Sequence, residues 1–134
     1  GQVGGAVILE TTFLIDLERE TARSEVGPAQ RFLEEHATEA FYLTFTIAGE
    51  LAAGFEANDR GRWETFVAPF HVLPCTHDVC WRYGRVSRNL REAGLLIGSN
   101  DIWIAATALA FELPVVTANQ RHYRRVADLT VVGY

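Results

Sequence analysis

The hydrophobic and polar positions of the chain form two kinds of segment. Short apolar runs bounded by polar or turn residues predict buried strands, whereas apolar residues three and four apart predict helix faces. We interpret 6–9, 41–45, 70–75, 114–119 and 129–134 as strands. Helical spacing fills most of the chain between them, so that strands and helices alternate along the sequence.

The predicted helices differ in how clearly they mark a buried face. Segment 77–93 has apolar residues alternately four and three apart, which is the strongest helical pattern in the chain. Segment 99–113 is apolar almost all round and predicts a central helix. Weaker patterns start at Thr11 or Thr12 and cover 27–37, 46–57 and 62–68, and 121–126 predicts a turn or a short helix.

This alternation predicts an α/β fold with a central, mainly parallel sheet flanked by helices. With 134 residues, the chain is interpreted as a single domain over 1–134, in which 1–5 are a processing or expression remnant, or disordered, without a structural role. In such sheets, functional groups gather beyond the carboxyl ends of strands where the strand order reverses. Glu10 and Asn119 follow two predicted strands and are expected at that rim.

Charge and composition narrow the class of protein. The chain has 17 acidic residues against 12 basic ones, and all of the basic residues are arginine. An acidic protein does not by itself indicate a nucleic-acid surface, but it is compatible with one when its acids hold a metal ion. No apolar run is long enough to span a membrane, and no basic segment precedes the first strand as in a signal peptide. We expect a soluble cytoplasmic protein.

Cys75 and Cys80 are the two cysteines of the chain, and His77 lies between them. A zinc site would need a second pair of ligands at comparable spacing, and the sequence has none. We therefore expect two packed thiols in a reducing compartment.

Three acids stand at the starts of predicted helices, next to the sheet or the core. Glu10 directly follows the buried run 6–9, Glu50 borders the apolar face of its helix, and Asp101 opens the central helix. Ordinary roles stay open for two of them. Asp101 suits a first-turn acid of a helix capped by Ser99 or Asn100, and Glu50 suits a flanking residue that reaches solvent.

Taken together, the three acids predict a metal site. Their mutual repulsion calls for a compensating cation. Carboxylate oxygens without sulfur or nitrogen ligands favour Mg²⁺ or Mn²⁺, which keep several waters and bind phosphate oxygens alongside. Such an ion activates water for the hydrolysis of a phosphodiester.

Four stretches carry a resemblance to a known family: "VILETTFLIDLE", "TIAGELAAG", "IGSNDIWIAATALA" and "PVVTANQRHYRRVADLTV". In this order the chain resembles PIN-domain nucleases, and among them the VapC-type toxins of type II toxin–antitoxin pairs. The resemblance implies a PIN-like three-layer sandwich and a Mg²⁺- or Mn²⁺-dependent endoribonuclease that cuts RNA, often tRNA or rRNA. It also implies a cognate VapB-like antitoxin and a homodimer.

The resemblance also implies roles for individual residues. The metal-binding and catalytic acids are expected to be Glu10, Glu50 and Asp101, and Asn119 takes the position of a fourth, often acidic, catalytic residue. Substrate-binding or supporting positions are expected at Thr12, Thr117, Asn100 and Arg121.

Two departures from the family pattern bear on activity. The family's first acid is usually aspartate, and Glu10 adds a methylene with roughly 1.5 Å of reach, whereas Mg²⁺ demands near-octahedral geometry. A shifted backbone, binding through water, a weakened enzyme and an engineered substitution all stay open as explanations. Behind Asn119, this chain has His122 where some relatives carry an acid.

Other functions remain as alternatives. A non-catalytic PIN-like module that binds RNA or a partner protein is the main one. A phosphoacceptor receiver domain normally has a lysine at the same rim, and this chain has none. Arg82, Arg85, Arg88 and Arg91 recur every three residues, which is typical of a solvated helix face or of a contact with an RNA backbone.

Overall fold

Five parallel strands form the central sheet of the fold. A computed structural model describes residues 5–134. The strands are β1 (Ala6–Leu9), β2 (Ala40–Thr44), β3 (His71–Leu73), β4 (Val115–Val116) and β5 (Val131–Val132). They lie in the order β3-β2-β1-β4-β5, and all four pairings are parallel. The predicted α/β fold with a mainly parallel sheet is confirmed.

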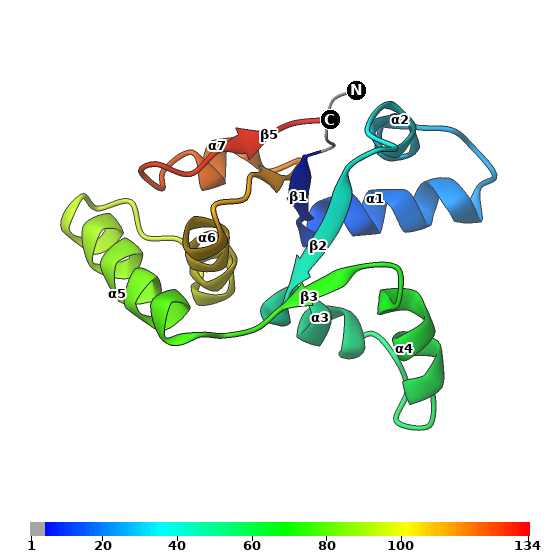
Figure 1. The fold of residues 1–134 in the computed structure, drawn as a ribbon, viewed down its shortest axis with the longest axis horizontal. Helices are drawn as coiled ribbons and strands as arrows, with labels where there is room; N and C mark the ends of the chain where they lie inside the picture. Colours follow the sequence, from blue (N-terminus) through cyan, green and yellow to red (C-terminus); the bar gives the residue numbers. More distant parts are fainter. Residues whose placement is uncertain (1–4) are drawn as a thin grey trace.

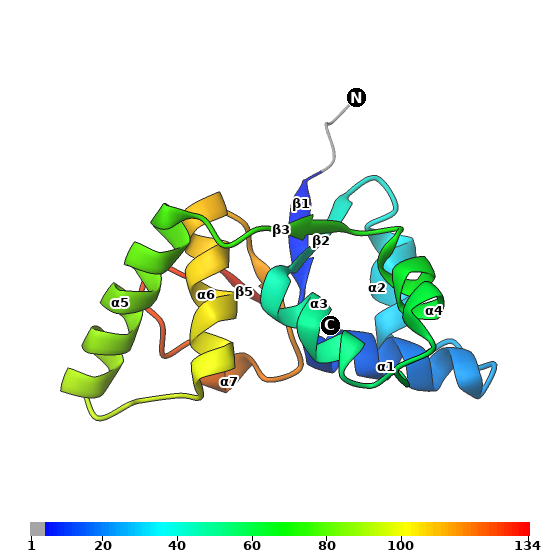
Figure 2. The same cartoon turned by 90° about the horizontal axis from the view of Figure 1, so that it is seen from below.

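Helices cover both faces of this sheet and make three layers (Figures 1 and 2). Helices α1 and α2 lie on one side of the sheet, and α5 and α6 pack together on the other. None of the helices in 5–134 is long and apolar enough to cross a bilayer. The bounds are α1 (Thr11–Ala22), α2 (Pro28–Glu35), α3 (Phe45–Ala52), α4 (Arg60–Val67), α5 (His77–Glu92), α6 (Ser99–Phe111) and α7 (Gln120–Tyr123).

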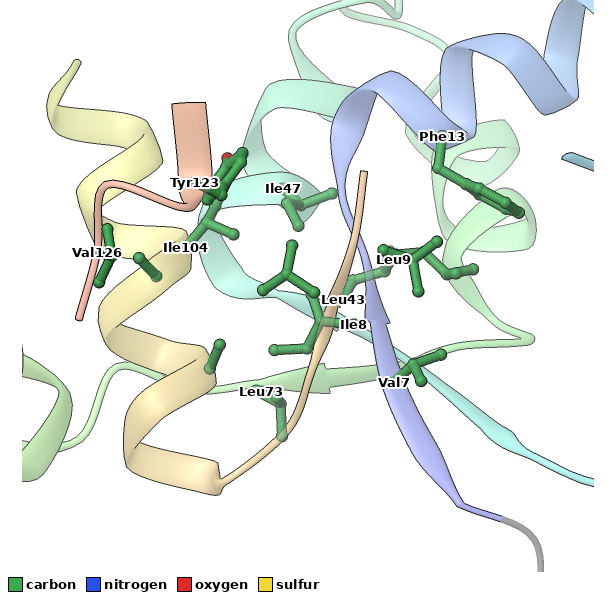
Figure 3. Packing of buried hydrophobic residues seen from close by; sticks show 14 of the residues in the cluster. Val7, Ile8, Leu9, Phe13, Leu43, Ile47, Leu73, Ile104, Tyr123 and Val126 are labelled. Carbon is green, nitrogen blue, oxygen red and sulfur yellow. The ribbon is translucent and has the colours of Figure 1, made fainter. Parts of the chain in front are cut away.

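The central strand β1 is the middle of the hydrophobic core. Its residues Val7, Ile8 and Leu9 are buried, as is expected for a strand of a parallel sheet that is covered on both faces. Leu43 of β2 and Ile104 of α6 are fully buried in the same cluster (Figure 3). The apolar run that predicted the strand is therefore apolar because helices cover both of its faces.

Strand β1 has the predicted bounds and β2 is shifted by one residue, whereas β3, β4 and β5 are shorter than the runs that predicted them. Phe45 was expected in a strand but begins α3, because the hydroxyl of Thr44 accepts a hydrogen bond from Ile47 N (3.1 Å) and caps the helix. At the N-terminus, residues 1–4 of the segment expected to lack a structural role lie outside the described residues. Gly5 does take part in the fold, since its carbonyl accepts a hydrogen bond from Ala40 N (2.9 Å).

The two cysteines differ from the prediction in exposure. Cys75 and Cys80 are free thiols with their sulfur atoms 3.7 Å apart, but both residues are exposed rather than packed in the interior. They lie at the start of α5, where the chain leaves the edge strand β3.

The strand order places a crevice between β1 and β4. From β1 the chain builds the sheet outward through β2 and β3, and it then returns to add β4 on the other side of β1. Leu9 of β1 pairs with Val116 of β4, so the residues that follow these strands, Glu10 and Thr117, meet at the reversal of strand order. Parallel sheets commonly place their functional groups at this point.

Candidate active site

Glu10 lies deep at this crevice, with only 5% of the residue exposed. It is the N-cap of α1, and its Oε2 atom accepts a hydrogen bond from Thr12 N (2.9 Å). The same oxygen accepts hydrogen bonds from the hydroxyls of Thr12 (2.6 Å) and Thr117 (3.0 Å). These donors compensate for the burial of the carboxylate and hold its orientation.

Thr12 and Thr117 therefore both contact Glu10. Their hydroxyls are also 3.3 Å from each other. Thr12 accepts a hydrogen bond from Ala118 N (3.1 Å), and Thr117 accepts one from Asn119 N (2.9 Å). The two threonines thus connect the start of α1 to the loop after β4, and Glu10 is fixed from both sides.

Glu50 reaches the site from α3. It is partly buried, and its Oε2 atom accepts a hydrogen bond from the hydroxyl of Thr11 (3.2 Å). Burial raises the pKa of Glu50 against the lowering effect of the Thr11 hydrogen bond, and the negative charges of Glu10 and Asp101 raise it further. The repulsion that the sequence predicted among the three acids is present in the fold.

Asp101 is in the first turn of α6, where it suits the helix dipole. Its Oδ1 atom accepts a hydrogen bond from the Tyr123 hydroxyl (3.0 Å), and its Oδ2 atom is 3.0 Å from Nε2 of His122. The same Tyr123 hydroxyl is 3.4 Å from Oε1 of Glu10. One hydroxyl therefore joins two of the three acids.

Tyr123 and Thr11 are site residues without a predicted role, and His122 was expected only to stand where some relatives carry an acid. Tyr123 is completely buried, and burial together with the charges of Glu10 and Asp101 raises its pKa well above the ordinary value. Its hydroxyl therefore stays protonated and acts as a donor. An apolar position after β4 predicts a buried aromatic ring, but that pattern does not show where the hydroxyl points.

The remaining predicted site residues lie at the surface. Asn119, Arg121 and Asn100 are exposed, and none of their side chains bonds to one of the three acids within residues 5–134. The expected cap of the central helix at Ser99 or Asn100 is wrong. The helix begins at Ser99, so its N-cap is Gly98. Glycine has no side chain, and the helix start therefore has no side-chain cap.

The arginines do not neutralise the acids. In the part of the chain that the structure describes, the ion-pair partner of this acid cluster is His122, which faces Asp101. On α5, Arg82 pairs with Asp78 and Arg88 pairs with Glu92. These arginines offset acids of their own helix, and no arginine within residues 5–134 forms an ion pair with Glu10, Glu50 or Asp101.

The donor set fits a hydrated divalent cation. Within residues 5–134, no group of three or more acidic, histidine or cysteine side chains is arranged so that it could hold a metal ion. Mg²⁺ keeps several waters and is commonly bound through one or two carboxylates, so a site of fewer protein ligands remains compatible with it. Glu50 and Asp101 are less enclosed than Glu10.

A groove of about 850 Å³ opens beside Glu50. Its apolar lining includes Ile15, Leu51 and Phe55 from α1, α3 and the segment after α3. Acids also line it, namely Glu18, Glu50, Glu56 and Asp59, against the single basic residue Arg62. The surface next to the candidate site is therefore apolar and negatively charged.

The family model of the PIN domain matches residues 7–129. The chain belongs to the PIN-domain family. The matched range contains all three acids of the crevice as well as Thr12, Thr117 and Tyr123.

Curated relatives of this PIN-domain chain are named as ribonucleases of the VapC group. Ribonuclease VapC1 of Haemophilus influenzae strain R2866 is 36% identical over 107 residues, which cover 75% of this chain and 79% of the relative. Ribonuclease VapC of Rickettsia bellii is 28% identical over 134 residues, with 94% of each chain covered. The predicted likeness to the VapC type is confirmed.

Solved structures of toxin–antitoxin complexes have the same fold as this PIN domain. A chain of the Rickettsia felis VapBC2 complex bound to a promoter DNA fragment aligns with a TM-score of 0.79 at 20% identity, covering 96% of this chain and 98% of that one. A chain of VapBC-1 from nontypeable Haemophilus influenzae aligns with a TM-score of 0.74 at 24% identity, covering 96% and 97%. The PIN-like sandwich predicted from the sequence is confirmed.

Proposed function

We propose that this chain is a toxin-type endoribonuclease that depends on Mg²⁺ or Mn²⁺ and is neutralised by a cognate VapB-like antitoxin. The observation that carries the proposal is the convergence of Glu10, Glu50 and Asp101 at the β1–β4 crevice without an arginine counterion. The names of the relatives as ribonucleases support RNA as the substrate.

Each residue of the crevice has a defined part in this proposal. Glu50 and Asp101 hold the ion, and Tyr123 keeps Asp101 aligned with Glu10 through its hydroxyl. Glu10 is fixed by three donors on Oε2 and adds negative charge at the back of the site. When bound, the cation supplies an activated water and neutralises charge on the phosphate. His122 is within hydrogen-bond distance of Asp101 and orients it from the solvent side.

RNA would approach from the exposed rim of the crevice. Asn119 and Arg121 lie there, directly after β4 and at the start of α7, and Asn100 lies next to Asp101. Arg121 can contact the phosphate backbone, whereas the two asparagines can bond sugar or base groups. These side chains are free for such contacts because they are exposed and do not bond to the acids.

The groove beside Glu50 suits the antitoxin better than it suits RNA. Four acids in its lining would repel a polyanion, and its apolar residues would remain unpaired against a phosphate backbone. A partner segment that carries both apolar and basic residues matches the groove and would also cover Glu50. Binding there would block access to the site, which accounts for neutralisation.

One observation favours a second candidate function, a PIN-like module with weakened catalysis. Oε2 of Glu10 already accepts three hydrogen bonds and is therefore less available to a metal ion than the shorter aspartate typical of the family. In this case the protein would still bind RNA or its partner but would cleave RNA slowly.

Cleavage of RNA by the purified protein tests the two candidates. The proposal expects cleavage with Mg²⁺ or Mn²⁺ that EDTA abolishes and that Glu50→Gln and Asp101→Asn each reduce by roughly 10²-fold or more. Glu34→Gln removes an exposed acid of α2 and serves as the matched control, with unchanged cleavage. Undiminished cleavage by Asp101→Asn would contradict the proposed site.

Glu10→Asp separates the enzyme from the weakened module. If Glu10→Asp cleaves RNA faster than the original protein, the protein is an active nuclease whose cleavage rate is limited by Glu10. If neither the original protein nor Glu10→Asp cleaves RNA while both bind it, the binding module is the correct function. Neutralisation on co-expression with a VapB-like protein encoded next to this gene would support the antitoxin, and light scattering tests the expected homodimer.

A further inference from the structure

Two thiols face each other at the start of α5, away from the acids of the crevice. The Sγ atoms of Cys75 and Cys80 are 3.7 Å apart, and both residues are exposed. They are the two cysteines of the chain, so any disulfide within one molecule must join them. Neither residue takes part in the proposed ribonuclease site.

The backbone of the helix start brings these thiols together. Thr76 is the N-cap of α5, and its hydroxyl accepts a hydrogen bond from Val79 N (3.2 Å). Cys75 directly precedes the cap, and Cys80 is the fourth residue of the helix, with its N–H bonded to Thr76 O (3.1 Å). Residues at these two positions pack together at many helix starts, where they fix the direction in which the chain enters the helix.

We propose that Cys75 and Cys80 are an oxidation site, at which hydrogen peroxide converts the two thiols into an intramolecular disulfide. One thiolate attacks an oxygen of the peroxide, so that an S–O bond forms, the O–O bond breaks and the sulfur becomes a sulfenic acid; the expelled hydroxide takes up the proton that the thiol released and becomes water. The second thiolate then attacks this sulfur, forms the S–S bond and expels hydroxide, which is protonated to a second water. In total, two thiols are oxidised and one peroxide is reduced to two waters.

The geometry of the pair favours this reaction. A disulfide has a length of about 2.05 Å, so the sulfurs have to approach by less than 2 Å, within reach of side-chain rotation at exposed positions. Partial desolvation and the neighbouring Cys80 raise the pKa of the Cys75 thiol. The Sγ atoms of the two exposed thiols lie within contact distance, so the sulfur that reacts first has the other one beside it as its partner.

The proposed bond would restrain the same helical turn that Thr76 caps. It would close a short ring from the segment after β3 to the first turn of α5. The loss of the cap in Thr76→Ala should then lower the melting temperature of the reduced protein more than that of the oxidised protein. This inference does not depend on the proposed ribonuclease function.

Oxidation of the full chain by hydrogen peroxide tests the proposal. Intact mass spectrometry should show a monomer that has lost two hydrogen atoms, with no free thiol, and a dithiol reductant should restore the original mass. Cys75→Ser should instead keep a sulfenic acid that dimedone traps. Disulfide-linked dimers, sulfinic acid on the original protein, or unreacted thiols would overturn the proposal.

A comparison with the unfolded chain tests the role of the fold. Because the helix start holds the thiols in contact, the disulfide should form at least about tenfold faster in the folded protein than in concentrated urea. Equal rates in the two states would show that α5 does not promote the bond and would overturn the inference.

Discussion

The hydroxyl of Tyr123 donates a hydrogen bond to Asp101 across 3.0 Å and thereby ties α7 to the first turn of α6. Because the same hydroxyl lies 3.4 Å from Glu10, it controls the spacing of two acids that come from different elements. The Tyr123 side chain is fully buried, so no water replaces this donor when it is removed.

Tyr123→Phe should therefore lower both activity and stability. Loss of a hydrogen bond to buried charged groups is expected to lower the free energy of unfolding by about 1.5–3 kcal/mol. Because Asp101 and Glu10 would no longer be held by the hydroxyl, RNA cleavage should slow by roughly 10- to 100-fold. Urea denaturation and single-turnover cleavage measure the two effects. Tyr83→Phe is the matched control, since the Tyr83 ring stacks on Trp103 and its hydroxyl has no hydrogen-bond partner in residues 5–134.

Glu50→Gln should stabilise the metal-free protein at neutral pH. The pKa of Glu50 is raised above 4.5 by burial and by the neighbouring acids, so the fold favours the protonated carboxyl. The stability that this group contributes is present below pH 4.5 and is lost as the pH rises through the raised pKa. Glutamine stays neutral, and the variant should melt a few degrees higher at pH 7 but level with the original protein in acid. A lower melting temperature at pH 7 would contradict the repulsion among the acids.

Divalent cations should make the original protein more stable than Glu50→Gln at pH 7. An ion that binds only the folded state at about ten times its dissociation constant raises the free energy of unfolding by about 1.4 kcal/mol. Thermal melts with Mn²⁺, with Mg²⁺ and after EDTA treatment should show this shift in the original protein and in Glu34→Gln. The shift should disappear in Asp101→Asn. An equal shift in that variant would place the ion elsewhere.

Glu20 caps a helix other than its own. From α1, its carboxylate accepts hydrogen bonds from the backbone N–H groups of Gly27, Ala29 and Gln30 at the start of α2. Gly27 provides no side-chain cap, and a Cβ atom there would lie 2.5 Å from Cδ of Glu20. Burial raises the pKa of Glu20, but the three backbone donors outweigh this effect and lower it overall.

Glu20→Gln should therefore reduce stability by about 1 kcal/mol at pH 7, as is typical for the loss of a helix cap. Because the pKa of Glu20 is lowered, its contribution is present above pH 4.5 and is lost as the pH falls through the lowered value. Urea denaturation at pH 7 and at pH 3 measures the difference between the variant and the original protein. A difference that does not shrink in acid would show that charge is not the cause.

The sequence predicted the elements and the rim because both depend on local patterns. The apolar run 6–9, the spacing in 77–93 and the apolar segment 99–113 each gave the correct type of element. Glu10 was expected at the rim because it directly follows β1, and residues that follow the strands of a parallel sheet lie at the same edge. Thr12 is two residues from that acid in the sequence, whereas Thr117 reaches it from the end of β4.

The missed features depend on contacts between distant segments. The hydrogen bond from Tyr123 to Glu10 spans 113 residues, and no periodic pattern reports on it. The cap of α2 by Glu20 was missed for a similar reason, because a cap is normally sought on the residue just before the helix.

The contacts around Glu10 and Asp101 depend on the last part of the chain. Thr117 and Tyr123 follow Glu10 by 107 and 113 residues. A chain that stops before Thr117 would keep only the Thr12 contacts to Glu10, and Asp101 would lack its tyrosine donor. Under the proposed ribonuclease function, an unfinished copy would therefore lack the complete acid cluster on which cleavage depends.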